Sequence, residues 1–401
     1  MSHFYRGLKR LYMFRRPAHV GILFRDRRGR PEAIAGDEEH LAAALEWLCR
    51  AQDVTSSGGV SAGYHLARGW KPAFPETTGY IIPTFLAAAD RFDGQEYRDR
   101  ALRMGDWEID IQLDSGAVRG GVGLNRDPLV FDTGQVILGW VALSRTTGRD
   151  RYLEAAVRAA DWLVDIQDED GGWSRHTFQG LARVYHARVA WAVLSIFQQT
   201  GQERHRRCGQ RHMEWVLSQA TGKDWFRKMA FDDVSAPLTH TIAYTLRGLW
   251  ECARLLKDEQ VPRLVVRACD RIIDRYRLTE EGSSGSEPAF LPATLDENWN
   301  PADGSYSCLT GNAQLALLWL KLARTREQDR YRLAAGRLID GVKTRQSLTS
   351  GSGAIRGAVP GSRPHGGGYL SYTYPNWAAK FLADALLEKM EVERMNGEDT
   401  P

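Results

Sequence analysis

Two kinds of apolar run alternate along the chain. Runs of the first kind are charged on one face and contain an acidic residue, a tryptophan and then a glutamine, as in EWLCRAQ (46–52), DWEIDIQ (106–112), DWLVDIQ (161–167) and EWVLSQ (214–219). Successive glutamines in these runs lie 52 to 60 residues apart. Continuing at this spacing identifies two further copies, RACDRIIDRY (267–276) and GRLIDGVKTRQ (336–346). The pattern predicts six outer helices.

Runs of the second kind are apolar almost all round, which is typical of helices that are buried on both sides. They occupy residues 77–89, 131–143, 185–197, 239–253, 308–323 and 374–387. Each repeat therefore reads as an outer helix, a long loop and an inner helix. Six such hairpins closed in a ring predict an all-α (α/α)6 toroid with parallel inner helices around a central funnel. We expect a basic arm at 1–32, the toroid at 33–391 and a polar tail at 392–401.

Two loops, SGAVRGGV (115–122) and SGAIRGAV (352–359), are nearly identical and follow the second and sixth outer runs. We interpret this arginine loop as part of the repeat. The links from inner to outer runs are short, whereas those from outer to inner runs reach roughly 20–30 residues, and long loops on a rigid scaffold usually carry function. We therefore expect the functional site where the inner helices begin.

Helix N-termini at this mouth would present free N–H groups and partial positive charge. The mouth therefore suits an anionic or hydroxyl-rich ligand, above all an acidic sugar. Its expected ligand-binding residues combine arginines, aromatic side chains and polar groups: Arg119, Arg188, Arg356, His186, Tyr244, Trp173, Asn312 and Tyr369.

Glu76 and Asp132 head the first two inner helices and are candidate acid and base or nucleophile for glycoside chemistry. The structural alternative is that Asp132 is an N-cap and that Thr77 caps the helix after Glu76. Because a helix N-terminus lowers a carboxyl pKa, we expect either residue to favour the role of base or nucleophile.

His240 is a candidate base, because it begins the fourth inner helix as His186 begins the third. A hydrogen-bonded core histidine is the alternative for each. Asp232 and Asp233 form an acidic pair that either shares a proton or binds a cation, or else belongs to a solvated turn. Tyr372 is a candidate acid in the glycine- and tyrosine-rich loop 356–377.

The composition excludes several classes of function. A formal net charge of +3 is too small to indicate nucleic-acid binding, and no apolar run is long enough to span a bilayer. No close pair of ligands indicates a metal, and no glycine-rich loop has a nucleotide-binding frame, so we expect no cofactor. The five cysteines contain no CxxC pair, which indicates a reduced, cytoplasmic protein. Residues 1–30 either pack on the domain or rest on an anionic membrane.

QDEDGGW (167–173) resembles the QW repeat of squalene cyclases and related prenyltransferases. The resemblance implies helical hairpins but not the chemistry of these enzymes. The cyclases use a DxDD motif, which this chain lacks, and the prenyltransferases use an Asp-x-Cys zinc pair, whereas Asp303 lies five residues from Cys308 here. PETTGYIIPTFL, CLTGNAQ and YPNWAAKFLADALL are similar to bacterial proteins encoded among polysaccharide-assembly genes. The six repeats also resemble the six-hairpin carbohydrate enzymes, namely toroidal glycoside hydrolases, polysaccharide lyases and glucuronyl C5-epimerases.

These observations favour an enzyme that acts on a glycan or glycoconjugate, with uronate-containing chains as the first expectation. Hydrolysis would use the carboxyl groups, whereas C5 epimerisation or elimination would use His240, Tyr372 and the arginines. Two alternatives stay open at this stage. One is an isoprenoid enzyme with an aromatic cavity, and the other is a glycan-binding scaffold without catalytic activity.

Overall fold

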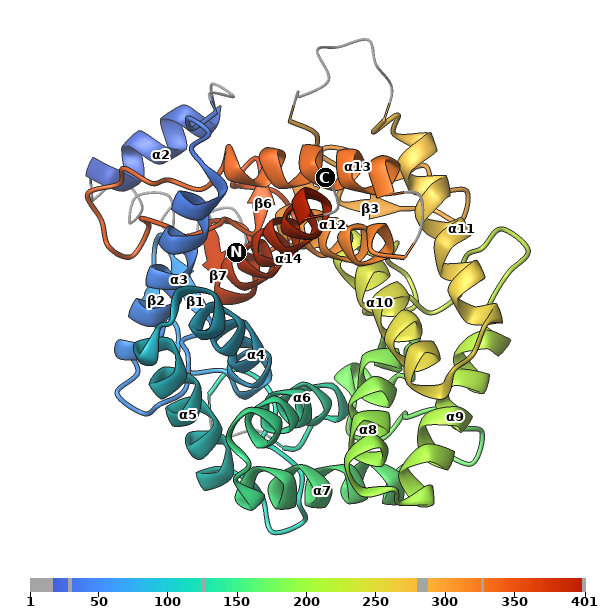
Figure 1. Cartoon of the computed structure of the whole chain (residues 1–401). Helices are drawn as coiled ribbons and strands as arrows, with labels where there is room; N and C mark the ends of the chain where they lie inside the picture. Colours follow the sequence, from blue (N-terminus) through green and yellow to red (C-terminus); the bar gives the residue numbers. More distant parts are fainter. Residues whose placement is uncertain (1–16, 28–30, 124–126, 280–287, 326–327, 399–401) are drawn as a thin grey trace, which may run out of the picture.

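The computed structural model describes residues 17–27, 31–123, 127–279, 288–325 and 328–398, and its helices form a closed ring (Figure 1). The outer helices are α3 (Asp37–Asp53), α5 (Gln95–Asp110), α7 (Asp150–Asp165), α9 (Glu203–Ser218), α11 (Gln260–Arg275) and α13 (Gln328–Lys343). The inner helices are α4 (Pro75–Phe92), α6 (Val130–Thr147), α8 (Ala187–Thr200), α10 (Thr239–Leu256), α12 (Leu309–Ala323) and α14 (Asn376–Glu398). The predicted (α/α)6 toroid is confirmed.

Each outer helix packs against the inner helix that precedes it in the chain. α5 packs on α4, α7 on α6, and so on to α13 on α12, because the links between these helices are short. The first outer helix, α3, packs instead on the last inner helix, α14, which also contacts α4. The two ends of the helical series therefore close the ring.

Glycines allow the inner helices to approach one another closely. A Cβ atom at Gly79 of α4 would lie 2.5 Å from Cα of Val136 in α6, and one at Gly139 would lie 2.3 Å from the carbonyl oxygen of Gly79. Any larger side chain at these positions would push the two helices apart. The pair α4 and α6 forms one of the most extensive contacts in the ring.

The glutamine at the end of an outer helix ties that helix to its own loop and to the next outer helix. Nε2 of Gln167 donates to the carbonyl oxygens of Gly171 and Cys208, each at 3.0 Å. Gln52, Gln112 and Gln346 make the equivalent pair of bonds. The acceptor of Gln346 in the next outer helix is His40 of α3, so the motif is also used where the ring closes.

The two arginine loops do not match in the register that their sequence similarity suggests. The equivalent glycines are Gly116 and Gly357, which have φ angles of 89° and 84°. A Cβ atom on either would lie 2.4 or 2.0 Å from a carbonyl oxygen of the next outer helix, so only glycine fits. The shared tripeptide is thus GAV at 116–118 and 357–359. Arg119 follows it and Arg356 precedes it, and the interpretation of a repeated arginine is corrected to a repeated glycine.

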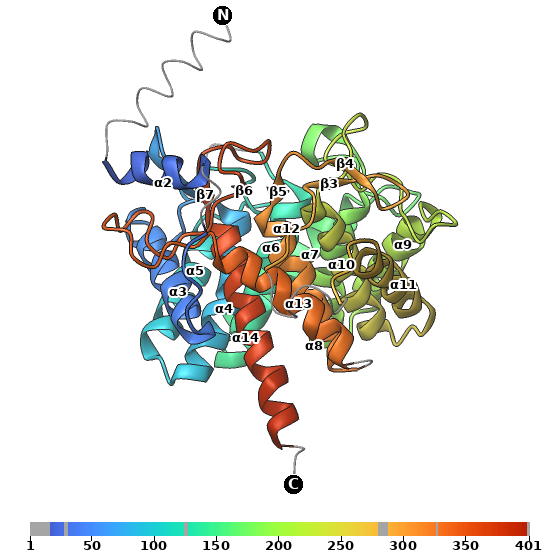
Figure 2. The ribbon, with the colours of Figure 1, turned by 90° about the horizontal axis from the view of Figure 1, so that it is seen from above.

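Short antiparallel strands join the long loops at the end where the inner helices begin, opposite to the C-terminus of α14 (Figure 2). β1 (Gly63–His65) lies between β2 (Gly69–Trp70) and β7 (Thr373–Pro375). β3 (Thr294–Leu295) pairs with β4 (Pro301–Asp303), and β5 (Ser307–Cys308) pairs with β6 (Ser362–Arg363). Two 3-10 turns, η1 (Phe178–Gly180) and η2 (Val184–His186), precede α8.

The described part of the N-terminal arm forms α2 (Pro17–Arg27) and packs on the toroid. His19 is buried, and the Asp26 carboxylate accepts a hydrogen bond from the backbone N–H of His365 at 2.7 Å. Within the described residues, no helix combines the length and the apolar character that crossing a membrane requires. Residues 1–16 and 28–30 lie outside the described part, and contact of the arm with a membrane surface stays a prediction.

Candidate active site at the loop end of the channel

A cavity of about 510 Å³ opens among the long loops at the end where the inner helices begin. We call it the mouth cavity. Half of the residues that line it carry aromatic rings, namely Phe74, Tyr80, Phe131, Phe178, Tyr185, Phe231, Tyr244, Tyr369 and Trp377. Its remaining lining residues are Glu76, Gly121, Leu129, Asp132, Thr177, Gln179, His186, Asp232 and His240.

The structure brings Glu76 and Asp132 together in this cavity. Each lies in the first turn of its inner helix, after an N-cap residue whose side chain makes no capping bond. Because Leu129 is the N-cap of α6, the interpretation of Asp132 as a cap is corrected. Phe74 holds the equivalent position in α4, so Thr77 does not cap that helix either.

Asp132 is buried, and its Oδ2 accepts a hydrogen bond from the backbone N–H of Gly121 at 2.6 Å. Glu76 has no hydrogen-bond partner among the described residues. One carboxyl group is therefore held in place by the loop before α6. The other faces the cavity and is available to a ligand.

Burial raises the pKa of both carboxyl groups. It raises the pKa of Asp132 to about 7, against the lowering effect of the Gly121 N–H. Burial and then the charge of Asp132 hold the pKa of Glu76 well above its usual value, although the Arg188 charge opposes this. The expectation that the helix N-terminus would lower these pKa values is therefore corrected, because loss of hydration outweighs the helix dipole.

A third buried carboxyl group, that of Glu108 in α5, lies close enough to Asp132 for the two to interact. It is fully buried, and neither of its oxygens has a hydrogen-bond partner among the described residues. Burial and then the Asp132 charge raise its pKa. Glu108 was not among the site residues predicted from the sequence. Comparison of the repeats could have found it. DWEIDIQ has Glu108 at the position where DWLVDIQ has the apolar Leu163, so an acid stands where the repeat expects a core residue.

Two histidines at the mouth are buried and neutral. Nδ1 of His240 lies 2.8 Å from Oε1 of Gln314, and burial lowers the pKa of His240 to about 4. Burial also lowers the pKa of His186 well below its usual value, and its Nδ1 has no hydrogen-bond partner in the part of the chain that the structure describes. At both residues burial is the largest cause of the lowered pKa. The His240 ring lies 4.4 Å from that of Tyr244.

Asp232 and Asp233 are held apart by different partners. The half-buried Asp232 accepts hydrogen bonds from the backbone N–H and the hydroxyl of Ser235 at 2.6 and 3.0 Å. Asp233 pairs with the buried Arg183 at 2.8 Å. This arrangement favours the solvated turn over a pair that shares a proton.

Several predicted ligand contacts lie outside the mouth cavity. Trp173 is fully buried and donates to the Leu163 carbonyl, so its expected place at the mouth is corrected to the core. Buried Asn312 bridges the backbone of Leu291 and Cys308, and its expected ligand contact is corrected to a structural role. Arg119, Arg356 and Tyr372 do not line the cavity either.

Tyr369 does line the mouth cavity, and its hydroxyl accepts a hydrogen bond from Nε1 of Trp377 at 2.9 Å. Arg188 lies behind the cavity, where its Nε donates to Gln135 at 2.9 Å. In the described part of the chain, no group of three His, Cys, Asp or Glu side chains is arranged to hold a metal ion. All five cysteines are free thiols and buried.

Residues 71–248 match the family model of the squalene-hopene cyclase C-terminal domain. No curated protein matches the chain in sequence. Similar solved structures include an unsaturated glucuronyl hydrolase from Bacillus sp. GL1, described as responsible for the degradation of glycosaminoglycan. It has a TM-score of 0.66 and 15% identity over 88% of this chain and 96% of that chain.

An unsaturated glucuronyl hydrolase specific for heparin has a TM-score of 0.68 and 14% identity over 90% of this chain and 99% of that chain. Cellobiose 2-epimerase from Spirochaeta thermophila has a TM-score of 0.66 and 16% identity over 88% of this chain and 95% of that chain. At this identity the likeness shows the toroid fold alone, and it extends over nearly the whole length of each chain.

Proposed function

We propose that the protein is a glycan-processing enzyme that hydrolyses a glycosidic bond in the mouth cavity. The observation that carries this proposal is the pair Glu76 and Asp132, two enclosed carboxyl groups that face one cavity and have different raised pKa values. Glycoside hydrolysis uses two carboxyl groups, one protonated and one ionised.

In the proposed mechanism, Glu76 is the general acid. Because its pKa lies well above the usual value, it keeps a proton near neutral pH and donates it to the leaving-group oxygen. Asp132, with a pKa of about 7, ionises in this range and either activates water or attacks the anomeric carbon. The Gly121 N–H holds the Asp132 carboxylate in one orientation.

The aromatic wall supports a saccharide ligand, since ring faces cover the apolar faces of sugars while a few polar groups fix their orientation. Neutral His240 and His186 supply such polar groups. Fold neighbours named for glucuronyl residues and for cellobiose also support a saccharide. No Arg or Lys among the described residues lines the mouth cavity, so neutral oligosaccharides are tested beside the uronate-containing ones.

The test incubates the purified chain with both groups of oligosaccharide in deuterated water, and measures reducing ends and proton NMR spectra. New reducing ends are expected, and Glu76→Gln and Asp132→Asn each lower the rate by about 10²–10⁴-fold. Glu214→Gln, an exposed carboxyl on α9, is the matched control and keeps full activity. Hydrolysis that persists in both site variants would overturn the proposal. Loss of a uronate H5 signal without new reducing ends would replace hydrolysis by C5 proton chemistry.

The aromatic wall and the cyclase family match favour a second candidate, an isoprenoid enzyme. A buried protonated carboxyl such as Glu76 can protonate an alkene, and aromatic faces stabilise cations. Squalene and prenyl diphosphates therefore belong in the same substrate panel. A cyclised hydrocarbon product that is absent with Glu76→Gln would favour this candidate, and glycan turnover would exclude it.

A further inference from the structure

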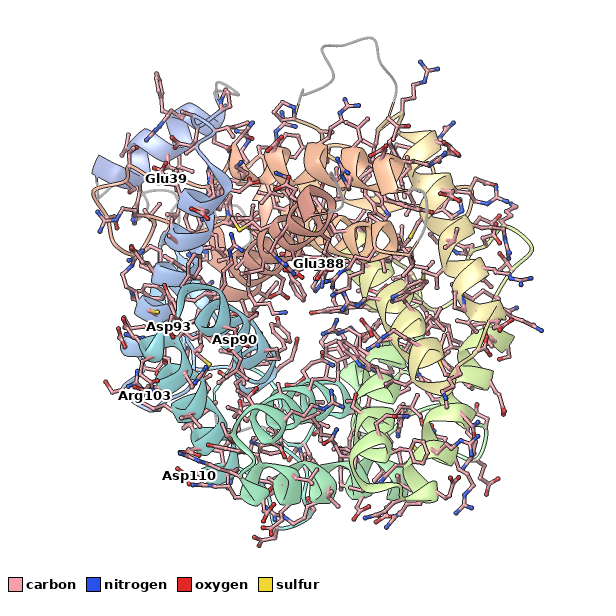
Figure 3. All side chains as sticks on the ribbon, in the orientation of Figure 1. Glu39, Asp90, Asp93, Arg103, Asp110 and Glu388 are labelled. Atoms are coloured by element: carbon pink, nitrogen blue, oxygen red, sulfur yellow. The ribbon has the colours of Figure 1, made fainter. Side chains whose placement is uncertain are left out.

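A second and larger cavity, of about 760 Å³, occupies the channel at the opposite end of the ring. We call it the basic cavity. Asp90 and Glu388, labelled in Figure 3, mark this end of the ring, where the inner helices finish. Tyr80 lines both cavities.

The lining of the basic cavity carries an excess of positive charge. Eight basic side chains line it, namely Arg91, Arg145, Arg188, Arg247, Arg254, Lys321, Lys380 and Arg394. Four acidic side chains line it, namely Asp90, Asp384, Glu388 and Glu391. Glu251 lies behind them and pairs with Arg247 and Arg254. The lining residues taken together with Glu251 carry three more positive than negative charges.

The excess is concentrated at Arg188, which is 5% exposed. Its Nε donates to the neutral amide of Gln135, and no carboxylate of the described residues pairs with it. A buried guanidinium without a counterion is unfavourable in a folded protein. An anion from solution would remove this imbalance.

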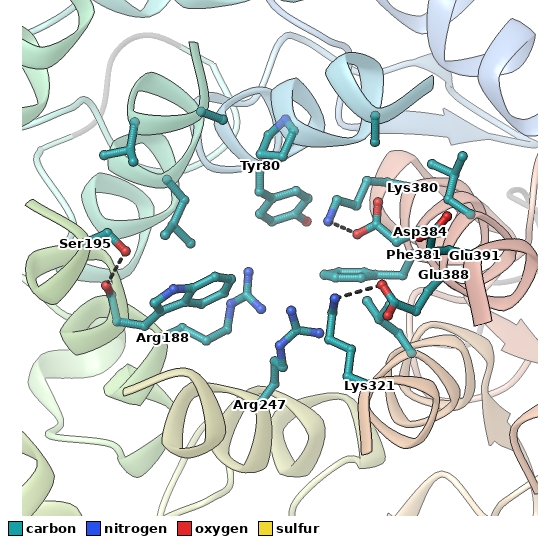
Figure 4. A pocket seen from close by; sticks show the side chains of 18 of the residues that line it. Tyr80, Arg188, Ser195, Arg247, Lys321, Lys380, Phe381, Asp384, Glu388 and Glu391 are labelled. Carbon is teal, nitrogen blue, oxygen red and sulfur yellow. Dashed lines mark hydrogen bonds and ion pairs between the residues drawn. The ribbon is translucent and has the colours of Figure 1, made fainter. Parts of the chain in front are cut away.

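Arg247 offers a second guanidinium beside the first. The Cζ atoms of Arg188 and Arg247 lie 5.3 and 5.5 Å from the centroid of the same Trp191 ring. Nη2 of Arg247 binds Glu251 at 2.6 Å, whereas its Nη1 is buried and has no partner. Figure 4 shows the two guanidinium groups side by side, pointing into the cavity.

Two lysines complete the inner group of cations. Lys321 pairs with Glu388 at 2.8 Å, and Lys380 pairs with Asp384 (Figure 4). Burial lowers the pKa of Lys380 to about 8, so this amine is close to losing its proton, and a nearby anion would favour the charged form. Asp384 and Glu388 thus already have basic partners. Among the described residues, Arg188 has no carboxylate partner and Nη1 of Arg247 has no hydrogen-bond partner, so these two groups remain available to an anion.

We propose that the basic cavity binds a small organic anion through Arg188 and Arg247, with a phosphate or carboxylate group held in their paired guanidinium forks. Planar guanidinium groups bind both kinds of oxyanion with two parallel hydrogen bonds. The rings of Trp191 and Phe381 and the volume of the cavity suit a ligand with a sugar-sized body. This binding site is separate from the mouth cavity and does not depend on the function proposed there.

Isothermal titration calorimetry of the full chain tests the proposal with glucose 1-phosphate, inorganic phosphate and glucuronate, and with glucose as the neutral control. At least one of the three anions is expected to bind, and glucose is not. The tightest of them identifies the anionic group and shows whether the sugar body contributes.

Arg247→Gln and Lys321→Gln are expected to weaken the anion at least about tenfold, because each removes a charge from the cavity wall. Arg275→Gln removes an exposed charge on α11 and leaves the affinity unchanged. Asp132→Asn alters the mouth cavity and also leaves it unchanged. Thermal unfolding shows that each variant is folded, and Lys321→Gln provides the test if Arg247→Gln is not.

Absence of saturable binding by all three anions would overturn the proposal. Equal affinity for glucose would also overturn it, because charge would then play no part. A folded Arg247→Gln and a folded Lys321→Gln that both bind as tightly as the wild type would place the anion elsewhere and overturn it as well.

Discussion

Glu76 and Asp132 combine two opposing influences on a carboxyl group. The helix N-termini that carry them favour the ionised form, but enclosure by aromatic side chains removes most of the water that stabilises it. The second influence is larger at both residues. The pKa of each carboxyl group therefore lies above its ordinary value although the group stands in the first turn of an inner helix.

The pH dependence of glycan turnover follows from the proposed roles. kcat/KM is expected to rise through about pH 7 as Asp132 loses its proton, and to fall at higher pH as Glu76 loses its own. Initial rates measured from pH 4 to pH 10 on the best substrate check this. An acidic limb near pH 4, where an ordinary carboxyl titrates, would contradict the assignment of Asp132.

Glu108→Gln is expected to stabilise the protein more at pH 8 than at pH 5. The folded pKa of Glu108 is raised, so the folded chain keeps a proton that the unfolded chain releases above the ordinary glutamate pKa of 4.5. Stability therefore falls as pH rises above that value, and the amide removes this dependence. Urea unfolding at the two pH values measures it. Glu108→Leu places at this position the residue that the next repeat has at Leu163, and it tests whether the buried carboxyl group causes the loss of stability. If both variants were less stable than the wild type at pH 8, this explanation would be contradicted.

At the scale of the element, the repeat glutamine fixes where each long loop begins. Gln167 joins three segments through one amide group, namely the end of α7, its loop and α9. Gln219 holds the corresponding place after α9. Among the described residues, its side-chain amide donates only to the hydroxyl of its neighbour Ser218, and the carbonyl groups around it have other donors. The glutamine therefore joins neighbouring segments in one repeat and makes only a local hydrogen bond in another.

Gln167→Ala is expected to lower the free energy of unfolding by about 2 kcal/mol, because two partly buried carbonyl groups lose their donor. Gln219→Ala is the matched control and should change it by less than about 0.5 kcal/mol. Chemical denaturation followed by circular dichroism provides both values. Equal losses in the two variants would show that the amide bonds of Gln167 do not carry the effect.

The helices and their order were predictable from the sequence, because a buried inner helix and a one-sided outer helix leave different patterns. The position of the mouth, with Glu76, Asp132, His186 and His240 around it, was predictable from the parallel inner helices. The loops were not, since their register depends on contacts between repeats. Arg119 and Arg356 share a sequence context, yet the glycine that meets the next outer helix lies on opposite sides of them. The depth of burial that sets the carboxyl pKa values also depends on the assembled wall.

At the scale of the whole molecule, the ring has one seam, where α3 meets α13 and α14. Asp37 of α3 binds Lys343 of α13 at 2.7 Å and also binds Lys389 of α14. Burial alone would raise the pKa of Asp37, but these two partners lower it below the ordinary aspartate value of 3.8. One carboxylate therefore joins three helices across the closure.

Asp37→Asn is expected to lower the free energy of unfolding by about 3 kcal/mol at neutral pH, because buried Lys343 loses its closest partner. The stabilisation by Asp37 is present above pH 3.8 and is lost as pH falls through its lower folded pKa. The difference between variant and wild type should therefore shrink below pH 4 in urea titrations. Glu39→Gln, an exposed acid in the same first turn, is the control. A difference that persists unchanged at pH 3 would contradict the ionic origin.

The closure of α3 on α14 also has a consequence for biosynthesis. The N-terminal end of a chain leaves the ribosome first. Among the ring helices α3 therefore emerges first, and its packing partner α14 emerges last (Figure 1). Until α14 has left the ribosome, α3 lacks its inner partner and α4 lacks one neighbour. The nascent chain must keep these apolar surfaces from other partners throughout translation. The wall of the channel is complete only after synthesis has passed the final inner helix.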